Sequence, residues 1–343
     1  MQPCQQDSRS FFEKLQSAED LDLRDNRGKR HGLAIVLVGV TLAVLSNRDG
    51  NLSSIHRHPG NHYKKLMTYL ELEKKSPISR AQLPRVLEKV AVEVFDDVIF
   101  AQFGIRLNEK EKDWFAVDGK ELRGSIESGE KRGEALVQVV GHANQQTVRQ
   151  DYYSGEKESE VPVVRSLLNN QRLASQKISM DALHCKPLTL EIIVAGGGKY
   201  LVGLKENQKE LKKQVSQTIQ TQAVLWKTET LEKGHGRIEY REYEFYDLLE
   251  MNKADRWNEL AIRTGIKVKR TREDCKSGKS SQQESYYLTN EIGNYEELSQ
   301  AVRLHWQVET NNHLRDVSLR EDEMRSKKRN YSAQWEKSEP WQQ

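Results

Sequence analysis

The apolar and polar positions of the first hundred residues recur with the period of a helix. A long apolar segment occupies residues 32–45, and an amphipathic one follows at residues 83–95. Residues 56–62 and the Ser76-Pro77 step are polar and contain turn formers, so they predict loops between helices. The pattern therefore predicts a small helical domain over residues 1–108.

From residue 113 the pattern changes to that of short strands. Three such segments predict an antiparallel meander with a tight reversal before its last strand: 113–118, 136–142 and 147–153. The next segments favour helix, strand, helix and strand in turn: 159–172, 177–181, 187–195 and 200–204. Strands followed by alternating helices and strands predict an α/β layer.

A β-rich insertion is predicted at about residues 225–292, before the last helix. A polar helix over residues 207–224 leads into it, residues 237–243 alternate like a strand, and residues 276–281 form a flexible turn. The chain then returns to a helical pattern over residues 295–314.

Composition and charge narrow the class of protein only slightly. The chain of 343 residues carries 54 Lys and Arg against 51 Asp and Glu, so its surface is densely charged and local basic patches form easily. Cys4, Cys185 and Cys275 lie far apart and are odd in number, which argues against a disulfide framework. The longest apolar run, residues 32–45, is too short to cross a bilayer and no secretory signal begins the chain, so we expect a cytoplasmic protein.

Three acids stand out from this pattern. Asp118 ends the apolar run that begins at Trp114, Asp181 ends the run that begins at Ile178, and Glu309 lies on the last predicted helix. Clustered carboxylates repel one another unless cations neutralise them, and oxygen ligands suit Mg²⁺ or Mn²⁺. The three acids therefore predict a site for two ions about 4 Å apart, which would serve phosphoryl transfer on nucleic acid.

Each acid also has an ordinary structural interpretation. Asp118 precedes a glycine and fits a turn, Asp181 fits the N-cap of the segment after it, and Glu309 fits a solvated helix position. Their shared placement favours the metal site over these three separate explanations.

Four segments together resemble the DDE transposases of insertion sequences, and among them the H-repeat-associated proteins. The segments are Val117-Asp118-Gly119-Lys120-Glu121-Leu122-Arg123-Gly124-Ser125, Met180-Asp181-Ala182-Leu183-His184, Leu204-Lys205-Glu206-Asn207-Gln208 and His305-Trp306-Gln307-Val308-Glu309. The resemblance covers about residues 11–325.

The resemblance implies an α/β fold with a ribonuclease H-like core, a helical N-terminal domain and a β-rich insertion before the last catalytic helix. The catalytic domain would span residues 109–325. It also implies Mg²⁺-dependent DNA strand cleavage and strand transfer at element ends, with Asp118, Asp181 and Glu309 as the catalytic and metal-binding acids. The partners would be the ends of the insertion sequence, a target DNA and further copies of the chain on DNA. The protein would be associated with the bacterial nucleoid.

Several polar residues are predicted to contact DNA. Cations just beyond Asp118 would hold phosphates that flank the cut. Further phosphate contacts are predicted from residues that follow the last core strand, from residues on a strand of the insertion and from residues on the last helix. Solvated turns and a salt-bridged strand are the alternatives for these positions. The candidates are Lys120, Arg123, Lys205, Asn207, Gln208, Arg237, Arg241, Arg303 and His305.

Two further patterns bear on activity. His305, Glu309 and His313 repeat every four residues, but they lack the spacing of a zinc metalloprotease and are not taken as a zinc site. Residues 326–343 have no apolar period and predict a disordered, atypical tail. The alternative function is therefore a truncated, catalytically impaired transposase relic that only binds DNA.

Overall fold

The computed structural model divides into two compact units, which we describe separately. One unit comprises residues 1–107, 122–134 and 312–343, and the other comprises residues 108–121 and 135–311. The structure describes residues 9–46, 51–73, 76–103, 112–126, 133–153, 157–170, 173–234, 236–251 and 253–317. The predicted tail at residues 326–343 lies outside the described residues.

Among the described residues, the first unit is built mainly from five helices. They are α1 (Phe11–Ser17), α2 (Leu33–Leu45), α3 (Leu52–Tyr69), α4 (Leu83–Leu87) and α5 (Val92–Gln102). Ser10 and Glu13 form a reciprocal capping box at the start of α1, and the Asn51 side chain caps α3 by accepting the Ser54 N–H at 2.8 Å. Buried leucines and valines from α1, α2 and α4 form a shared core.

Two predictions for this region were wrong. Residues 56–62 were expected to form a loop, but they lie within α3, where the Pro59 ring packs closely against Gly39 of α2. Residues 83–95 were expected to form one helix, but it breaks between α4 and α5. There the backbone of residues 89–91 bonds to residues 21–23, with Ala91 N–H donating to the Leu21 carbonyl at 3.0 Å. These tertiary hydrogen bonds outweigh the local helical period.

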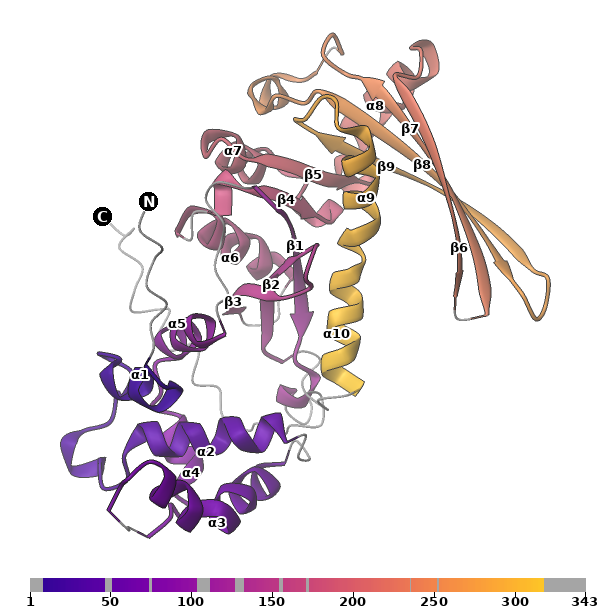
Figure 1. The fold of residues 1–343 in the computed structure, drawn as a ribbon. Helices are drawn as coiled ribbons and strands as arrows, with labels where there is room; N and C mark the ends of the chain where they lie inside the picture. The colour runs from indigo at the N-terminus through magenta and orange to yellow at the C-terminus, as the bar shows by residue number, and fades with distance from the viewer. Residues whose placement is uncertain are drawn as a thin grey trace, which may run out of the picture. The chain divides into compact units, whose positions relative to one another are not determined.

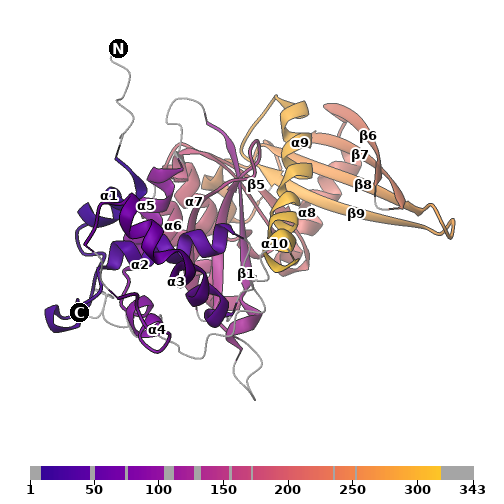
Figure 2. The ribbon, with the colours of Figure 1, turned by 60° about the horizontal axis from the view of Figure 1, so that its bottom comes forward.

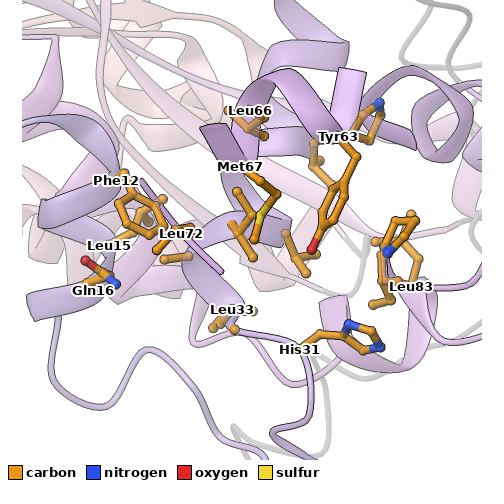
Figure 3. A pocket seen from close by; sticks show the side chains of 18 of the residues that line it. Phe12, Leu15, Gln16, His31, Leu33, Tyr63, Leu66, Met67, Leu72 and Leu83 are labelled. Carbon is orange, nitrogen blue, oxygen red and sulfur yellow. The ribbon is translucent and has the colours of Figure 1, made fainter. Parts of the chain in front are cut away.

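A cavity of about 550 Å³ lies among these helices. Its wall is mostly apolar, as the side chains of Phe12, Leu33, Met67 and Leu83 in Figure 3 illustrate. None of the three predicted catalytic acids lines it.

The second unit contains a mixed sheet of nine strands in the order β3-β2-β1-β4-β5-β9-β8-β7-β6. Its first half consists of β1 (Trp114–Glu121), β2 (Ala135–Gly141), β3 (Thr147–Tyr153), β4 (Lys177–Met180) and β5 (Lys199–Leu204). Strands β1, β2 and β3 form the predicted antiparallel meander, and β1, β4 and β5 run parallel. The predicted α/β class is confirmed.

Helices cover both faces of this half of the sheet. Figure 1 shows α6 (Lys157–Asn170) and α7 (Pro187–Ala195) on one side and α9 (Tyr295–His305) on the other. Helix α9 contacts β1, β4 and β5, and Figure 2 shows it again beside β5 and β9. Helix α8 (Lys209–Thr221) buries only one apolar face, formed by Leu211, Val215 and Ile219.

The β-rich stretch continues the same sheet. Strands β6 (Trp226–Gly234), β7 (Arg237–Asp247), β8 (Thr264–Asp274) and β9 (Ser280–Thr289) form antiparallel pairs, and β9 joins β5. Tyr243 and Phe245 of β7 are fully buried in a core with Leu298 of α9. The β-rich stretch therefore shares a hydrophobic core with α9.

The last helix differs from its predicted form. Residues 295–314 were expected to form one helix, but α9 ends at His305 and α10 (Gln307–Val317) follows after a break at Trp306. The Trp306 side chain contacts the Tyr287 hydroxyl and the Arg270 guanidinium, whose carbon lies 5.6 Å from the centre of the ring. In the part of the chain that the structure describes, no helix combines the length and apolarity that crossing a membrane requires.

Candidate active site

The strand register places the two aspartates side by side. Val117 of β1 and Met180 of β4 form the last parallel pair, and Asp118 and Asp181 are the residues that directly follow Val117 and Met180. Asp118 was expected to end its strand, but β1 continues to Glu121, because β2 still pairs with it beyond that point. Asp118 therefore lies within the paired part of a strand, opposite Gln138.

Glu309 reaches the same place from the other end of the sequence. Val308 packs with Ala116 and Val140 of the sheet, and Glu309 follows it in the first turn of α10. A cavity of about 320 Å³ is lined by all three acids, together with Lys205, His305, Trp306 and residues of β9. Three segments that are distant in sequence thus bring their carboxylates to one cavity.

The acids interact electrostatically. Burial, followed by the charges of Glu160, Asp181 and Glu309, raises the pKa of Asp118 to about 7, against a smaller opposite effect of His184. The Asp118 carboxylate is thus held where its negative charge is unfavourable. A cation in the cavity would offset this unfavourable charge.

The donor chemistry fits Mg²⁺ or Mn²⁺. All three acids offer oxygen, and Mg²⁺ typically takes only one or two carboxylates and completes its shell with water and substrate phosphates. Among the described side chains, no three His, Cys, Asp or Glu residues are placed to hold a single ion together. The cavity therefore suits ions whose ligands come partly from the acids and partly from a phosphate substrate. It suits an ion enclosed by protein ligands alone less well.

Asp181 also has the structural role that its sequence suggested as an alternative. Its Oδ1 accepts the Leu183 N–H at 2.8 Å and caps a short 3₁₀ helix, Ala182–His184. The capping bond orients the carboxylate without using its second oxygen. The two interpretations of Asp181 are thus compatible.

A fourth acid, which no sequence pattern indicated, lies beside Asp118. Glu160 of α6 is only 9% exposed and accepts hydrogen bonds from the Tyr153 hydroxyl at 3.0 Å and from the fully buried His184 ring at 2.9 Å. A Cβ atom on Gly119 would lie 2.5 Å from the Glu160 carboxyl carbon, so this acid lies directly against the strand. No sequence pattern distinguishes an acid on an amphipathic helix from a solvated one. The nearest signal is its partner His184, which belongs to the segment around Asp181.

Of the predicted DNA contacts, Lys205 lines the acid cavity. Asn207 donates to the Ala182 carbonyl and Gln208 to the Cys185 carbonyl at 2.9 Å, so both brace the loop that follows Asp181. Lys120 is buried at 6% exposure, and Arg123 is exposed but belongs to the other unit.

The arginines of the insertion and of α9 are mostly ion-paired. Arg241 binds Glu232 at 3.0 Å and also Glu239, and Arg303 binds Glu232 at 2.9 Å, whereas Arg237 is exposed. The salt-bridged strand, which was the alternative interpretation, is present at Arg241. These arginines do not line the acid cavity.

His305 does line the cavity, but it is held from within. Its Nδ1 lies 3.0 Å from the Ser179 hydroxyl, and burial lowers its pKa to about 4 although Asp181 opposes the shift. The ring is therefore neutral at neutral pH. A neutral ring gives a phosphate no ionic contact.

The raised pKa of Asp118 predicts how stability depends on pH. The unfolded acid has a pKa near 3.8 and the folded one about 7, so between these values the folded state binds more protons and unfolding becomes easier as pH rises. The loss is at most about 4 kcal/mol. We expect Asp118→Asn to melt above the wild type in EDTA at about pH 8 and level with it at about pH 4, and Mn²⁺ to close the gap at high pH. An equal difference in melting temperature at both pH values would contradict this.

The chain is similar to a known protein family and to several known proteins. The family described as transposase DDE domain matches residues 109–335. The chain is 25% identical over 322 residues to the "H repeat-associated putative transposase YhhI" of Escherichia coli strain K12, covering 90% of this chain and 83% of that protein. It is 25% identical over 326 residues to the "Putative transposase YncI" of Escherichia coli O157:H7, covering 90% and 80% of the two chains.

A further relative comes from another bacterium. The "Uncharacterized protein in dhlA 3'region" of Xanthobacter autotrophicus is 28% identical over 235 residues, which cover 67% of this chain and 77% of that protein. The family match covers more than half of the chain and includes Asp118, Asp181 and Glu309. The chain therefore belongs to the DDE transposases of insertion sequences.

Proposed function

We propose that this transposase cleaves DNA strands at the ends of its insertion sequence and joins them to a target, in a reaction that depends on divalent metal ions. The observation that supports this most is the convergence of Asp118, Asp181 and Glu309 on one cavity. Carboxylates from separate segments, held on two neighbouring strands and one helix, are the arrangement that two-metal phosphoryl transfer uses. We propose these three residues as the catalytic acids.

Asp118, Asp181 and Glu309 would hold two Mg²⁺ or Mn²⁺ ions. The bound ions would supply Lewis acidity to the scissile phosphate and lower the pKa of an attacking water or 3′-hydroxyl. The protein itself orients the acids: the Leu183 N–H fixes Asp181, and the β1–β2 ladder fixes Asp118. The raised pKa of Asp118 supports a site that is completed by cations.

The strand order supports a more specific fold. An antiparallel meander whose first strand runs parallel to two further strands is the arrangement expected of a ribonuclease H-like core. We propose that the core spans residues 109–325, with the helical residues 1–108 and the β-rich residues 225–292 as its accessory parts. Both would enlarge the surface available to DNA.

DNA contacts are proposed at two levels. Lys205 lines the acid cavity and would hold a phosphate beside the cut, and the exposed Arg123 and Arg237 would bind other phosphates of the DNA backbone. Arg241 and Arg303 would have to exchange a carboxylate for a phosphate to bind DNA, and Lys120 would contribute from a buried position. Asn207 and Gln208 would act through the loop that they brace. Assembly of several copies on paired ends is part of the same proposal, as is a place in the cytoplasm with the nucleoid.

An end-cleavage assay tests the proposal. Labelled duplexes carrying the element end, and duplexes with the end sequence scrambled, are incubated with the protein and Mg²⁺, and nicked and joined strands are separated on gels. We expect nicking and joining of the end duplex only, and none in EDTA. Specific binding without cleavage would support the relic instead, and cleavage without preference for the end would indicate a nuclease.

A further inference from the structure

A buried hydrogen-bonded chain connects the last helix to the sheet beneath the acid cavity. The Ser179 hydroxyl, which is 1% exposed, lies 2.9 Å from His142 Nε2, 3.0 Å from His305 Nδ1 and 3.3 Å from the Phe115 carbonyl. One hydroxyl has a single proton, so a bond to the carbonyl requires both rings to donate to the serine oxygen. Such a chain joins β1, β4, α9 and His142, the residue that follows β2, at one atom.

The position of Ser179 in the strand relates this chain to the acids. Ser179 pairs with Ala116 across β4 and β1, and Asp181 and Asp118 each follow two residues later. Side chains two apart in a strand share a face, so Ser179 and Ala116 lie on the same face of the sheet as the two aspartates. A side chain that contacts Ser179 or Ala116 is therefore held at a defined place relative to Asp118 and Asp181.

Helix α9 is held on the sheet at both ends. At its start, Glu297 accepts a hydrogen bond from the Trp114 indole at 2.9 Å and an ion pair from Lys177 at 2.5 Å. At its end, His305 contacts Ser179. The helix then breaks at Trp306, so the hydrogen bonds of α9 alone do not fix the course of the chain toward Glu309.

A second anchor lies between the break and the acid. Val308 packs on Ala116 and Val140, and Glu309 follows at once. Glu309 is thus placed by His305 on Ser179 and by Val308 on Ala116, the two members of one strand pair. Without the hydrogen bond between His305 and Ser179, α10 would keep the contact of Val308 with the sheet but could rotate about it.

We propose that His305 is a positioning residue, which through Ser179 and His142 fixes Glu309 at the distance from Asp118 and Asp181 that metal binding requires. This rests on the proposed metal-dependent function and replaces the predicted DNA contact at His305. The neutral state of the ring suits this role, because a hydrogen bond to a serine needs no charge. Groups that orient metal ligands in this way typically contribute about 10- to 100-fold to metal affinity.

The test compares His305→Leu, His305→Asn and Ser179→Ala. Asparagine places a polar atom near the position of Nδ1 and keeps the contact with Ser179, whereas leucine and the alanine at 179 remove it. Ser299→Ala is the matched control, because this buried serine of α9 donates within its own helix, to the Glu296 carbonyl at 2.7 Å. Mn²⁺ binding is measured without DNA from the electron paramagnetic resonance signal of free Mn²⁺, and kcat and KM are measured with end DNA.

We expect His305→Leu and Ser179→Ala to weaken Mn²⁺ binding and to lower kcat, each by about 10- to 100-fold, with KM for DNA unchanged. His305→Asn should restore most of both, and Ser299→Ala should match the wild type. If Ser179→Ala does not fold, the two His305 variants at the cavity wall still decide the question.

Two results would overturn the inference. One is a His305→Leu variant that raises KM for DNA while Mn²⁺ affinity and kcat stay unchanged, which would mark His305 as a DNA contact. The other is Mn²⁺ binding equal in His305→Leu, His305→Asn and wild type. Since Mn²⁺ binding needs no DNA, a wild type that binds Mn²⁺ through Asp118 but cleaves nothing would refute the proposed function and leave the role of His305 measurable.

Discussion

Replacing Asp181 with asparagine is expected to lower the rate of strand cleavage by about 10³-fold, because a lost metal ligand removes several kcal/mol of transition-state stabilisation. The fold should be preserved. The asparagine side-chain oxygen can still accept the Leu183 N–H that caps the 3₁₀ helix. DNA affinity, measured by fluorescence anisotropy with labelled end duplexes, should not fall.

The matched control for this variant is Asp113→Asn. Asp113 immediately precedes β1, is exposed, and does not line the acid cavity. Its replacement should leave cleavage and melting temperature unchanged. Equal cleavage rates for Asp181→Asn and the wild type would remove Asp181 from the catalytic acids, whatever the DNA affinity of the two proteins.

The second large effect is expected at Gly119. An added Cβ would lie 2.5 Å from the Glu160 carboxyl carbon and 2.9 Å from the Tyr153 hydroxyl, both of which are held by hydrogen bonds. We expect Gly119→Ala to lower the free energy of unfolding by about 1–3 kcal/mol, the usual cost of overpacking. It should also abolish most cleavage, since the strand must shift next to Asp118.

Gly234→Ala provides the comparison. Gly234 also lies in a strand, β6, but a Cβ there meets nothing within 4 Å. Urea denaturation should show no loss of stability for this variant. The double variant Gly119→Ala with Glu160→Ala should recover part of the lost stability, because the second change removes the carboxylate that the new methyl group meets. A Gly119→Ala protein as stable as Gly234→Ala would show that Glu160 moves aside freely.

The local pattern of apolar residues predicted that Asp118 and Asp181, the two acids at neighbouring strands, lie close together. Asp118 and Asp181 follow apolar runs whose strands pair in parallel, and adjacent parallel strands necessarily present corresponding residues side by side. Glu160 could not be found in this way. Its proximity to Asp118 depends on how α6 packs on the sheet, and an acid on a helix is usually solvated.

The failures along the helices have a common cause. The break at residues 88–91 is set by backbone bonds to residues 21–23, and the break at Trp306 coincides with contacts to Tyr287 and Arg270. Hydrophobic period contains no information on such distant partners. The ion pairs of Arg241 and Arg303 with Glu232 are of the same kind, since they depend on the register of β6 and β7 and on the docking of α9.

The continuity of the sheet across β5 and β9 limits how this protein can be rearranged. The β-rich stretch is joined to the core by a ladder of backbone hydrogen bonds, and Gln283 to Tyr287 of β9 form part of the cavity wall. It is therefore no exchangeable module: a chain shortened by removing β6 to β9 would lose one wall of the catalytic cavity and leave β5 as an open edge, ready to pair with other chains.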